Sequence, residues 1–99
     1  MGVRENKVEK SLKDKVKALG GKSYKWISGE PGVTDQIVIV SGNFWLVEVK
    51  TVDGVLSPVQ KRRHEELGAL GARVRTVYGE MGVREFIEEV KDVIKTAAT

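Results

Sequence analysis

The 99-residue sequence predicts one domain, residues 1–99, which is long enough to bury a hydrophobic core without disulfide or metal staples. It contains no cysteine and a single histidine, His64, which excludes a disulfide scaffold, a thiolate zinc site, a cysteine nucleophile and a site of several histidines. Its 17 basic residues exceed 14 acidic ones, which suits a nucleic-acid partner without proving one, and since no stretch resembles a membrane helix or signal peptide we expect a soluble, cytoplasmic protein without a membrane partner.

The first half of the chain predicts one helix followed by three strands. Residues 5–19 carry apolar side chains at helical spacing, and the two glycines that follow end this predicted helix. Residues 22–27 predict the first strand, and a loop rich in glycine follows it. Two segments rich in β-branched and aromatic residues, 34–40 and 44–51, predict the next two strands.

The second half predicts a helix, a strand and a last helix. Ser57 and Pro58 are a favourable N-cap and first helical residue, and we expect their helix to run to about Leu67. Residues 72–78 alternate apolar and polar side chains as a strand does, and residues 82–98 place apolar side chains on one helical face. The order α-β-β-β-α-β-α predicts an α/β fold, with helices packed on a small sheet.

The middle strands are predicted to pair as a hairpin that brings charged residues together. A loop of two or four residues places Asp35 directly opposite Glu48, and Lys50 then points to the same face. A loop of three residues would place Asp35 opposite Val49 instead. The sequence does not decide between these loops.

Two carboxylates at this distance repel one another, so a positive charge must offset them. One interpretation is an ion pair between Lys50 and either acid on an edge strand. The other is a divalent cation held by Asp35 and Glu48, because Mg²⁺ is commonly bound by one or two carboxylates together with waters and substrate phosphates. Spacing alone leaves both interpretations open.

A third acid comes from the first predicted helix. On a helical wheel Glu9 lies at the flank of the apolar face, whereas Glu5 lies within that face but at the fraying start of the helix. Either acid could lean toward the sheet. Each also fits a solvated acid near a helix N-terminus, where the helix dipole favours negative charge.

Three segments in this order, GVTDQIVIV, FWLVEVKT and LSPVQ, resemble the VRR-NUC domain, a virus-type replication-repair branch of the PD-(D/E)xK nucleases. In that pattern a Gly-Val-Pro-Asp-Arg element precedes a strand, a Glu-x-Lys motif follows, and Ser-Pro-x-Gln starts a helix. The resemblance runs from about Glu5 to Val77. It implies a restriction-endonuclease-like αβββαβα fold, with a small mixed sheet flanked by helices.

The resemblance also implies roles for particular residues. Asp35 and Glu48 match the two metal ligands, with the Val49 carbonyl as a third, and Glu9 matches the acid that holds the metal directly or through water. Lys50 matches the lysine that orients or activates the attacking water.

Further implied contacts lie around these ligands. Gln60 matches a glutamine near the waters of the metal, and Lys25 matches a basic residue that faces phosphate. Other candidates for DNA contact are basic residues of the first strand and second helix: Lys22, Arg62 and Arg63.

Two positions depart from the family pattern. Thr34 replaces the proline, which changes backbone stiffness rather than ligand chemistry. Gln36 replaces the arginine after the acid, which lowers the expectation of a DNA contact there.

Family members resemble Mg²⁺- or Mn²⁺-dependent endonucleases that hydrolyse branched DNA such as Holliday junctions, a DNA-repair activity. A phage-encoded member would act in the host cytoplasm. Standalone members of this size resemble homodimers, whose two sites suit paired nicks. Trp26, Phe44 and Trp45 fit either a dimer interface or the core.

The alternative function is a non-catalytic DNA-binding or assembly module on a nuclease-like fold. The intact acids of the motif argue against it.

Two weaker signals do not change this interpretation. Residues 20–23, GGKS, lack the upstream glycine of a phosphate-binding loop and follow a helix rather than a strand. His64 lies one helical turn after Gln60 and would be an apt proton carrier in a cleft. A lone histidine in a charged helix is usually a surface residue.

Overall fold

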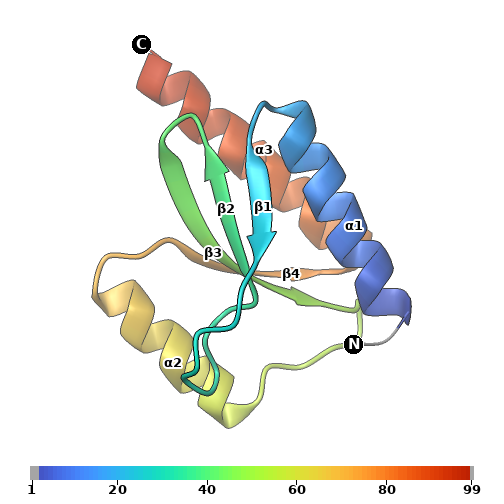
Figure 1. The fold of residues 1–99 in the computed structure, drawn as a ribbon, viewed down its shortest axis with the longest axis vertical. Helices are drawn as coiled ribbons and strands as arrows, with labels where there is room; N and C mark the ends of the chain where they lie inside the picture. The colour runs from blue at the N-terminus through green and yellow to red at the C-terminus, as the bar shows by residue number, and fades with distance from the viewer. Residues whose placement is uncertain (1–2, 99) are drawn as a thin grey trace.

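The computed structural model describes residues 3–98 and follows the predicted order of elements (Figure 1). In chain order these are α1 (Val3–Ala18), β1 (Lys22–Lys25), β2 (Gln36–Val40), β3 (Asn43–Lys50), α2 (Pro58–Ala69), β4 (Val74–Tyr78) and α3 (Gly79–Ala98). One sheet has the strand order β1-β2-β3-β4; its first two pairings are antiparallel, and β3 pairs with β4 in parallel. The predicted α/β class with a small mixed sheet is confirmed.

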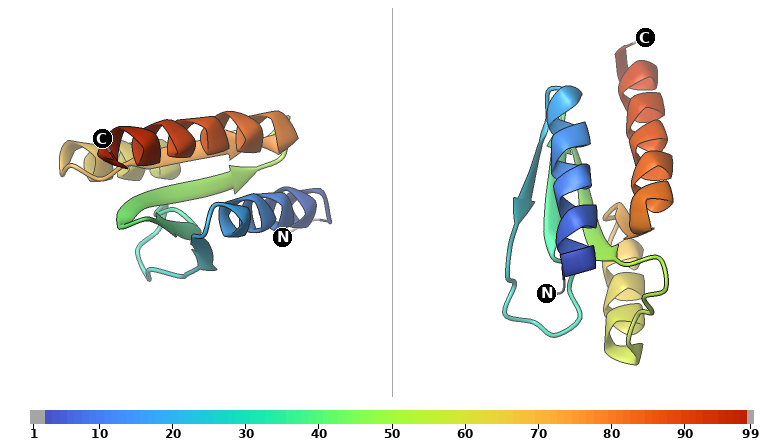
Figure 2. Two further views of the ribbon diagram at one scale, coloured as in Figure 1. Left: turned by 90° about the horizontal axis from the view of Figure 1, so that it is seen from above. Right: turned by 90° about the vertical axis from the view of Figure 1, so that its right-hand side faces the viewer.

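Two helices cover one face of this sheet. The α1 and α3 helices contact each other and pack over β3, with α1 also contacting β1 and α3 contacting β4 (Figures 1 and 2). Alternate residues of the strands point into this core because successive side chains of a strand face opposite sides. The buried apolar side chains are Leu12, Val16, Val38, Val40, Trp45, Val47, Val49, Val77, Val83, Phe86, Ile87 and Val90.

Trp45 lies at the centre of this core. It is fully buried, its ring meets the edge of Phe86 at a centroid distance of 5.9 Å, and its indole N–H donates to Glu89 at 3.1 Å. The interface role considered for Trp45 is therefore wrong. Trp26 is half-buried, and Phe44 is 58% exposed on the opposite face.

The hairpin between β2 and β3 has a two-residue loop, Ser41 and Gly42, with φ angles of 50° and 80°. Positive φ at both positions is the geometry of a tight hairpin turn that matches the twist of the strands. Val40 pairs with Asn43 and Gln36 with Val47. Continued by one residue, this register places Asp35 opposite Glu48, so the predicted register is confirmed.

The segment between β1 and β2 differs from its prediction, since β1 ends at Lys25 rather than residue 27 and β2 begins at Gln36 rather than residue 34. The chain leaves the sheet here to pack on α2. Gly32 approaches that helix so closely that a Cβ atom would lie 2.7 Å from the Val59 carbonyl oxygen.

Other boundaries move by one to three residues. The α3 helix begins at Gly79 rather than residue 82, because Glu80 in its first turn accepts a hydrogen bond from Ser11 at 2.6 Å and pairs with Lys15 at 3.6 Å. These are contacts with α1, which the local sequence pattern does not reveal. Likewise α1 begins at Val3, β4 begins at Val74, and α2 extends to Ala69.

The α2 helix packs differently from the other two. None of its residues is buried, and it contacts β4 on the sheet face that α1 and α3 leave open. Ser57 caps it as predicted, since the Ser57 hydroxyl accepts from the Gln60 amide at 3.1 Å. None of the helices within residues 3–98 has the length and apolar character needed to cross a membrane.

Candidate active site

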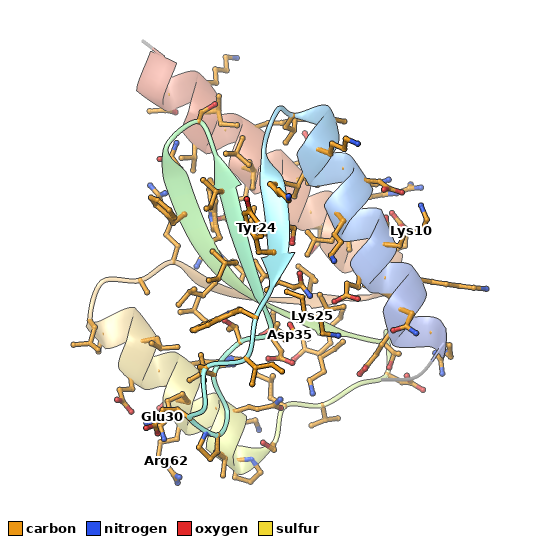
Figure 3. All side chains as sticks on the ribbon, viewed as in Figure 1. Lys10, Tyr24, Lys25, Glu30, Asp35 and Arg62 are labelled. Atoms are coloured by element: carbon orange, nitrogen blue, oxygen red, sulfur yellow. The ribbon has the colours of Figure 1, made fainter. Side chains whose placement is uncertain are left out.

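The predicted acids meet at the end of the hairpin that lies away from its turn. Asp35 immediately precedes β2, and Glu48 and Lys50 lie near the end of β3. Glu48 sits on the face opposite the core, between Val47 and Val49, whose side chains are in the core. Figure 3 shows Asp35 beside Lys25, where β1 and β2 leave the sheet.

Glu48 is a buried acid whose environment disfavours its charge. Only 6% of the residue is exposed. Burial, and then repulsion from Asp35, raise the pKa of Glu48 to about 7, whereas Lys50 acts in the opposite direction. The closeness of Asp35, Glu48 and Lys50 on one face is the arrangement that the register predicts.

Asp35 experiences the same conflict to a lesser degree. Burial raises the pKa of Asp35, and repulsion from Glu9 adds to this shift. The backbone N–H of Val49 opposes it by donating to Asp35 Oδ1 at 3.2 Å, and Lys25 opposes it through its charge. Buried Glu48 and half-buried Asp35 therefore form an acid pair whose repulsion a cation would relieve.

Glu9 approaches the site from α1 but is held by other partners. Its Oε1 accepts a hydrogen bond from Gln36 Nε2 and lies 3.7 Å from Lys25 Nζ. Gln36 is fully buried, and its Oε1 accepts from Ser23 at 3.1 Å. Within residues 3–98 no group of three or more Asp, Glu or His side chains is arranged to hold a metal ion, so the three acids are not one ready cluster.

Gln36 is a residue that sequence reasoning missed. Its departure from the family arginine suggested only a lost DNA contact, whereas the amide fixes the position of Glu9. A signal was present, since Gln36 is the polar residue at a core-facing position of β2. A buried polar side chain in such a strand requires a partner.

The two candidate residues on α2 make different contacts. The Gln60 side-chain oxygen accepts from the Ser57 backbone at 2.9 Å, so it completes the helix cap. His64, one turn later, brings its Nε2 to 4.0 Å from Glu48 Oε1. The charged sequence around His64 suggested a surface residue, whereas the structure places its ring beside Glu48.

The candidate DNA-binding residues separate into exposed and engaged side chains. Lys25 is half-exposed beside Glu9, and Lys22 lies over the Tyr24 ring at 4.6 Å. Arg62 is exposed and points away from α2 (Figure 3). Arg63 instead binds the loop before β2, donating to the Pro31 carbonyl at 3.2 Å and pairing with Glu30 at 3.5 Å.

Three buried polar atoms around this site find no hydrogen-bond partner within residues 3–98: Trp26 Nε1, Thr34 Oγ1 and His64 Nε2. Thr34 adjoins Asp35 in sequence, and the Trp26 backbone N–H donates to the Asp35 carbonyl at 3.1 Å. Buried polar groups are normally paired. Of the three atoms, His64 Nε2 faces an acid of the site, at 4.0 Å from Glu48 Oε1.

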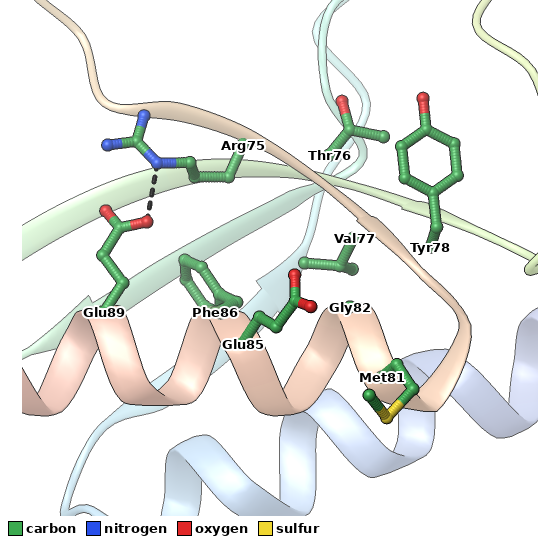
Figure 4. A pocket seen from close by; sticks show the side chains of 9 residues that line it. All are labelled: Arg75, Thr76, Val77, Tyr78, Met81, Gly82, Glu85, Phe86 and Glu89. Atoms are coloured by element: carbon green, nitrogen blue, oxygen red, sulfur yellow. Dashed lines mark hydrogen bonds and ion pairs between the residues drawn. The ribbon is translucent and has the colours of Figure 1, made fainter.

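A surface pocket elsewhere does not involve the predicted site residues. It lies between β4 and α3, where Arg75 Nε donates to Glu89 at 2.8 Å (Figure 4). Its lining residues are Arg75, Thr76, Val77, Tyr78, Met81, Gly82, Glu85, Phe86 and Glu89.

A mixed α/β sheet whose hairpin presents Asp35, Glu48 and Lys50 on one face has the architecture of a PD-(D/E)xK-type nuclease. Comparison with known proteins agrees. A phage protein named "Putative nuclease p44", from Acyrthosiphon pisum secondary endosymbiont phage 1, is 39% identical over 74 residues, which cover 73% of this chain and 80% of that protein.

A solved structure described as a VRR_NUC domain superposes with a TM-score of 0.79 and 32% identity, covering 88% of this chain and 97% of that one. No protein-family model matches the sequence. The chain belongs to the VRR-NUC family of nucleases.

Proposed function

We propose that this protein is a divalent-metal-dependent endonuclease that hydrolyses phosphodiester bonds in branched DNA. The pair of half-buried Asp35 and buried Glu48 carries the proposal. Burial disfavours the charge of both acids, Asp35 further disfavours that of Glu48, and Lys50 supplies one opposing charge. Two carboxylates in such a setting suit Mg²⁺ or Mn²⁺, which bind oxygen ligands and retain waters for contact with phosphate.

The residues of the site have distinct proposed roles. Asp35, Glu48 and the Val49 carbonyl hold the cation, which when bound supplies positive charge to the phosphodiester and activates water. Lys50 orients the nucleophile and stabilises the negative charge that develops on the phosphoryl oxygens. Glu9 reaches the cation directly or through water, and Gln60 contributes near that water shell.

DNA is proposed to bind across the basic residues next to these acids. Lys25 is the nearest candidate, because it already interacts with Asp35 and Glu9. Lys22 and Arg62 are further candidates for phosphate contacts, which position the backbone without reading sequence. Preference for branched DNA is carried over from the family resemblance.

Cleavage of a four-way junction tests this function. We expect the protein to nick the junction in Mg²⁺ or Mn²⁺, and Asp35→Asn to reduce the single-turnover rate by at least about 100-fold, the scale of losing one preorganised electrostatic group. An asparagine oxygen retains the acceptor for the Val49 N–H, so the local fold should persist. The substitution Asp14→Asn, in an exposed acid of α1, is the matched control.

A linear duplex of the same sequence tests selectivity for branched DNA. Equal cleavage of duplex and junction would contradict that part of the proposal. If the unmodified protein cuts neither substrate in either metal, the alternative of a non-catalytic DNA-binding or assembly module is favoured.

We also propose that the protein acts as a homodimer. The sheet face opposite the core exposes two aromatic side chains, Tyr24 at 48% and Phe44 at 58%. Half-buried apolar side chains of β2 and β3, namely Ile37, Ile39 and Leu46, lie between them. A two-fold interface on this face would present two sites to a symmetric junction.

Sedimentation at micromolar concentration should therefore show a dimer. We expect Phe44→Ser to shift the equilibrium toward monomer, because it removes a central aromatic contact. The control Leu70→Ser changes an apolar residue of similar exposure, 78%, at the end of α2. A monomeric unmodified protein would contradict the proposal.

A further inference from the structure

The His64 ring carries a buried nitrogen that faces a carboxylate. The side chain is only 10% exposed, and Nε2 has no hydrogen-bond partner within residues 3–98. Glu48 Oε1 lies 4.0 Å from Nε2, and the Glu48 side chain is 8% exposed. A separation of 4.0 Å is too long for a direct hydrogen bond.

The contact made by the other ring nitrogen, Nδ1, indicates which nitrogen of His64 bears the hydrogen. His64 forms a hydrogen bond with the Gly32 backbone that favours the protonated nitrogen, and because Nε2 is unpartnered, Nδ1 makes this bond. A carbonyl oxygen only accepts, so Nδ1 carries the hydrogen. Burial, and to a smaller degree Lys50, disfavour a second proton on the ring by lowering the pKa of His64.

A neutral ring with its hydrogen on Nδ1 has a lone pair on Nε2. That lone pair and the ionised form of the Glu48 carboxylate are two acceptors that face each other. Two hydrogen bonds of about 2.8 Å that meet at one oxygen at roughly 90–110° separate their outer atoms by about 4.0–4.6 Å. The observed 4.0 Å matches one bridging donor such as water.

We propose that His64 is a positioning residue of the active site, whose Nε2 and the Glu48 carboxylate together hold one water molecule beside the cation. This inference rests on the proposed function, and it adds a residue outside the acid, lysine and glutamine set. The anchor for His64 is the Gly32 carbonyl, which ties the loop before β2 to the water that the site orients.

Nitrogen NMR tests the tautomer directly, because His64 is the only histidine in the chain. In metal-free protein at pH 8, above the pKa of about 7 of Glu48, we expect a protonated Nδ1 and an unprotonated Nε2. Saturating Mg²⁺, which is diamagnetic, should shift the Nε2 resonance while Nδ1 keeps its hydrogen. A protonated Nε2, or an Nε2 resonance that Mg²⁺ does not move, would overturn the inference.

Two substitutions separate positioning from a merely structural role. His64→Asn retains a donor near Gly32 but lacks a group at the Nε2 position, whereas His64→Gln reaches that position and loses the Gly32 contact. We expect His64→Asn to bind Mn²⁺ about 10- to 100-fold more weakly by calorimetry, the usual effect of losing an outer-shell partner. His64→Gln should stay within about threefold of the unmodified protein.

If His64→Gln bound Mn²⁺ more weakly than His64→Asn, His64 would be an anchor for the loop rather than a positioning residue. Equal losses of Mn²⁺ affinity in the two variants would also overturn the inference. Thermal unfolding of each variant checks that it folds, and the NMR measurement needs no variant. The cleavage assay separates the two failures. A protein that cuts DNA but shows no effect at His64 refutes this inference alone, whereas one that neither binds Mn²⁺ nor cuts refutes the proposed function.

Discussion

Metal-free Glu48→Gln protein should be more stable than the unmodified protein at pH 8 by roughly 3 kcal/mol, with the difference disappearing near pH 4. The reason is that the pKa of Glu48 rises from 4.5 to about 7 on folding. Below pH 4.5 the group is protonated in both states, and its favourable contribution is complete. As the pH rises from about 4.5 through 7, the unfolded state loses its proton first, so stability is lost.

Denaturant unfolding in chelator at several pH values measures this difference. Glutamine is neutral at every pH, so the stability of the variant should lack the loss that the unmodified protein shows across this window. Glu85→Gln, a change in an exposed acid of α3, is the matched control. Parallel pH profiles for Glu48→Gln and the unmodified protein would contradict the prediction.

Divalent metal should reverse this ranking at pH 8. A cation that binds only the folded state stabilises it by mass action. Saturating Mg²⁺ is therefore expected to raise the stability of the unmodified protein and to leave Glu48→Gln nearly unchanged, since the variant lacks one ligand. Glu48→Gln is expected to gain stability at pH 8 and to lose metal binding for the same reason, because the variant lacks the buried negative charge.

Lys50→Ala is expected to lower the single-turnover cleavage rate by about 100- to 1000-fold, while junction affinity changes only a few-fold. A fixed cation at the reacting phosphate acts mainly on the charge that develops in the transition state, and losing one such group has this magnitude. Ground-state DNA binding is instead spread over several basic residues. Quenched-flow cleavage and metal-free binding by anisotropy measure the two quantities separately.

Lys61→Ala is the control for Lys50→Ala, because Lys61 is an exposed lysine of α2. It should leave the cleavage rate unchanged. If Lys50→Ala weakened binding as much as cleavage, Lys50 would be a phosphate clamp rather than a group that acts on the reacting centre.

The sequence determined the two strands of the hairpin and the candidate acids, and it left the loop length open. The two-residue turn at Ser41 and Gly42 in the structure sets the register, which places Asp35 opposite Glu48 with Lys50 on the same face. These are local relations, because strand alternation and turn geometry depend on residues close in the chain. The start of α2 was equally accessible, since Ser57, Pro58 and Gln60 form a capping motif within four residues.

Only the tertiary structure decided which polar groups support the acids. Gln36 holds Glu9 across 27 residues of sequence, and His64 meets Gly32 and Glu48 because α2 packs on the loop before β2. Such contacts depend on how elements distant in sequence pack together. Because α2 has no buried residue, its sequence has no apolar periodicity that would predict which face packs on the sheet. Local patterns encode a strand's own register, whereas the partners of a buried polar atom depend on packing between elements.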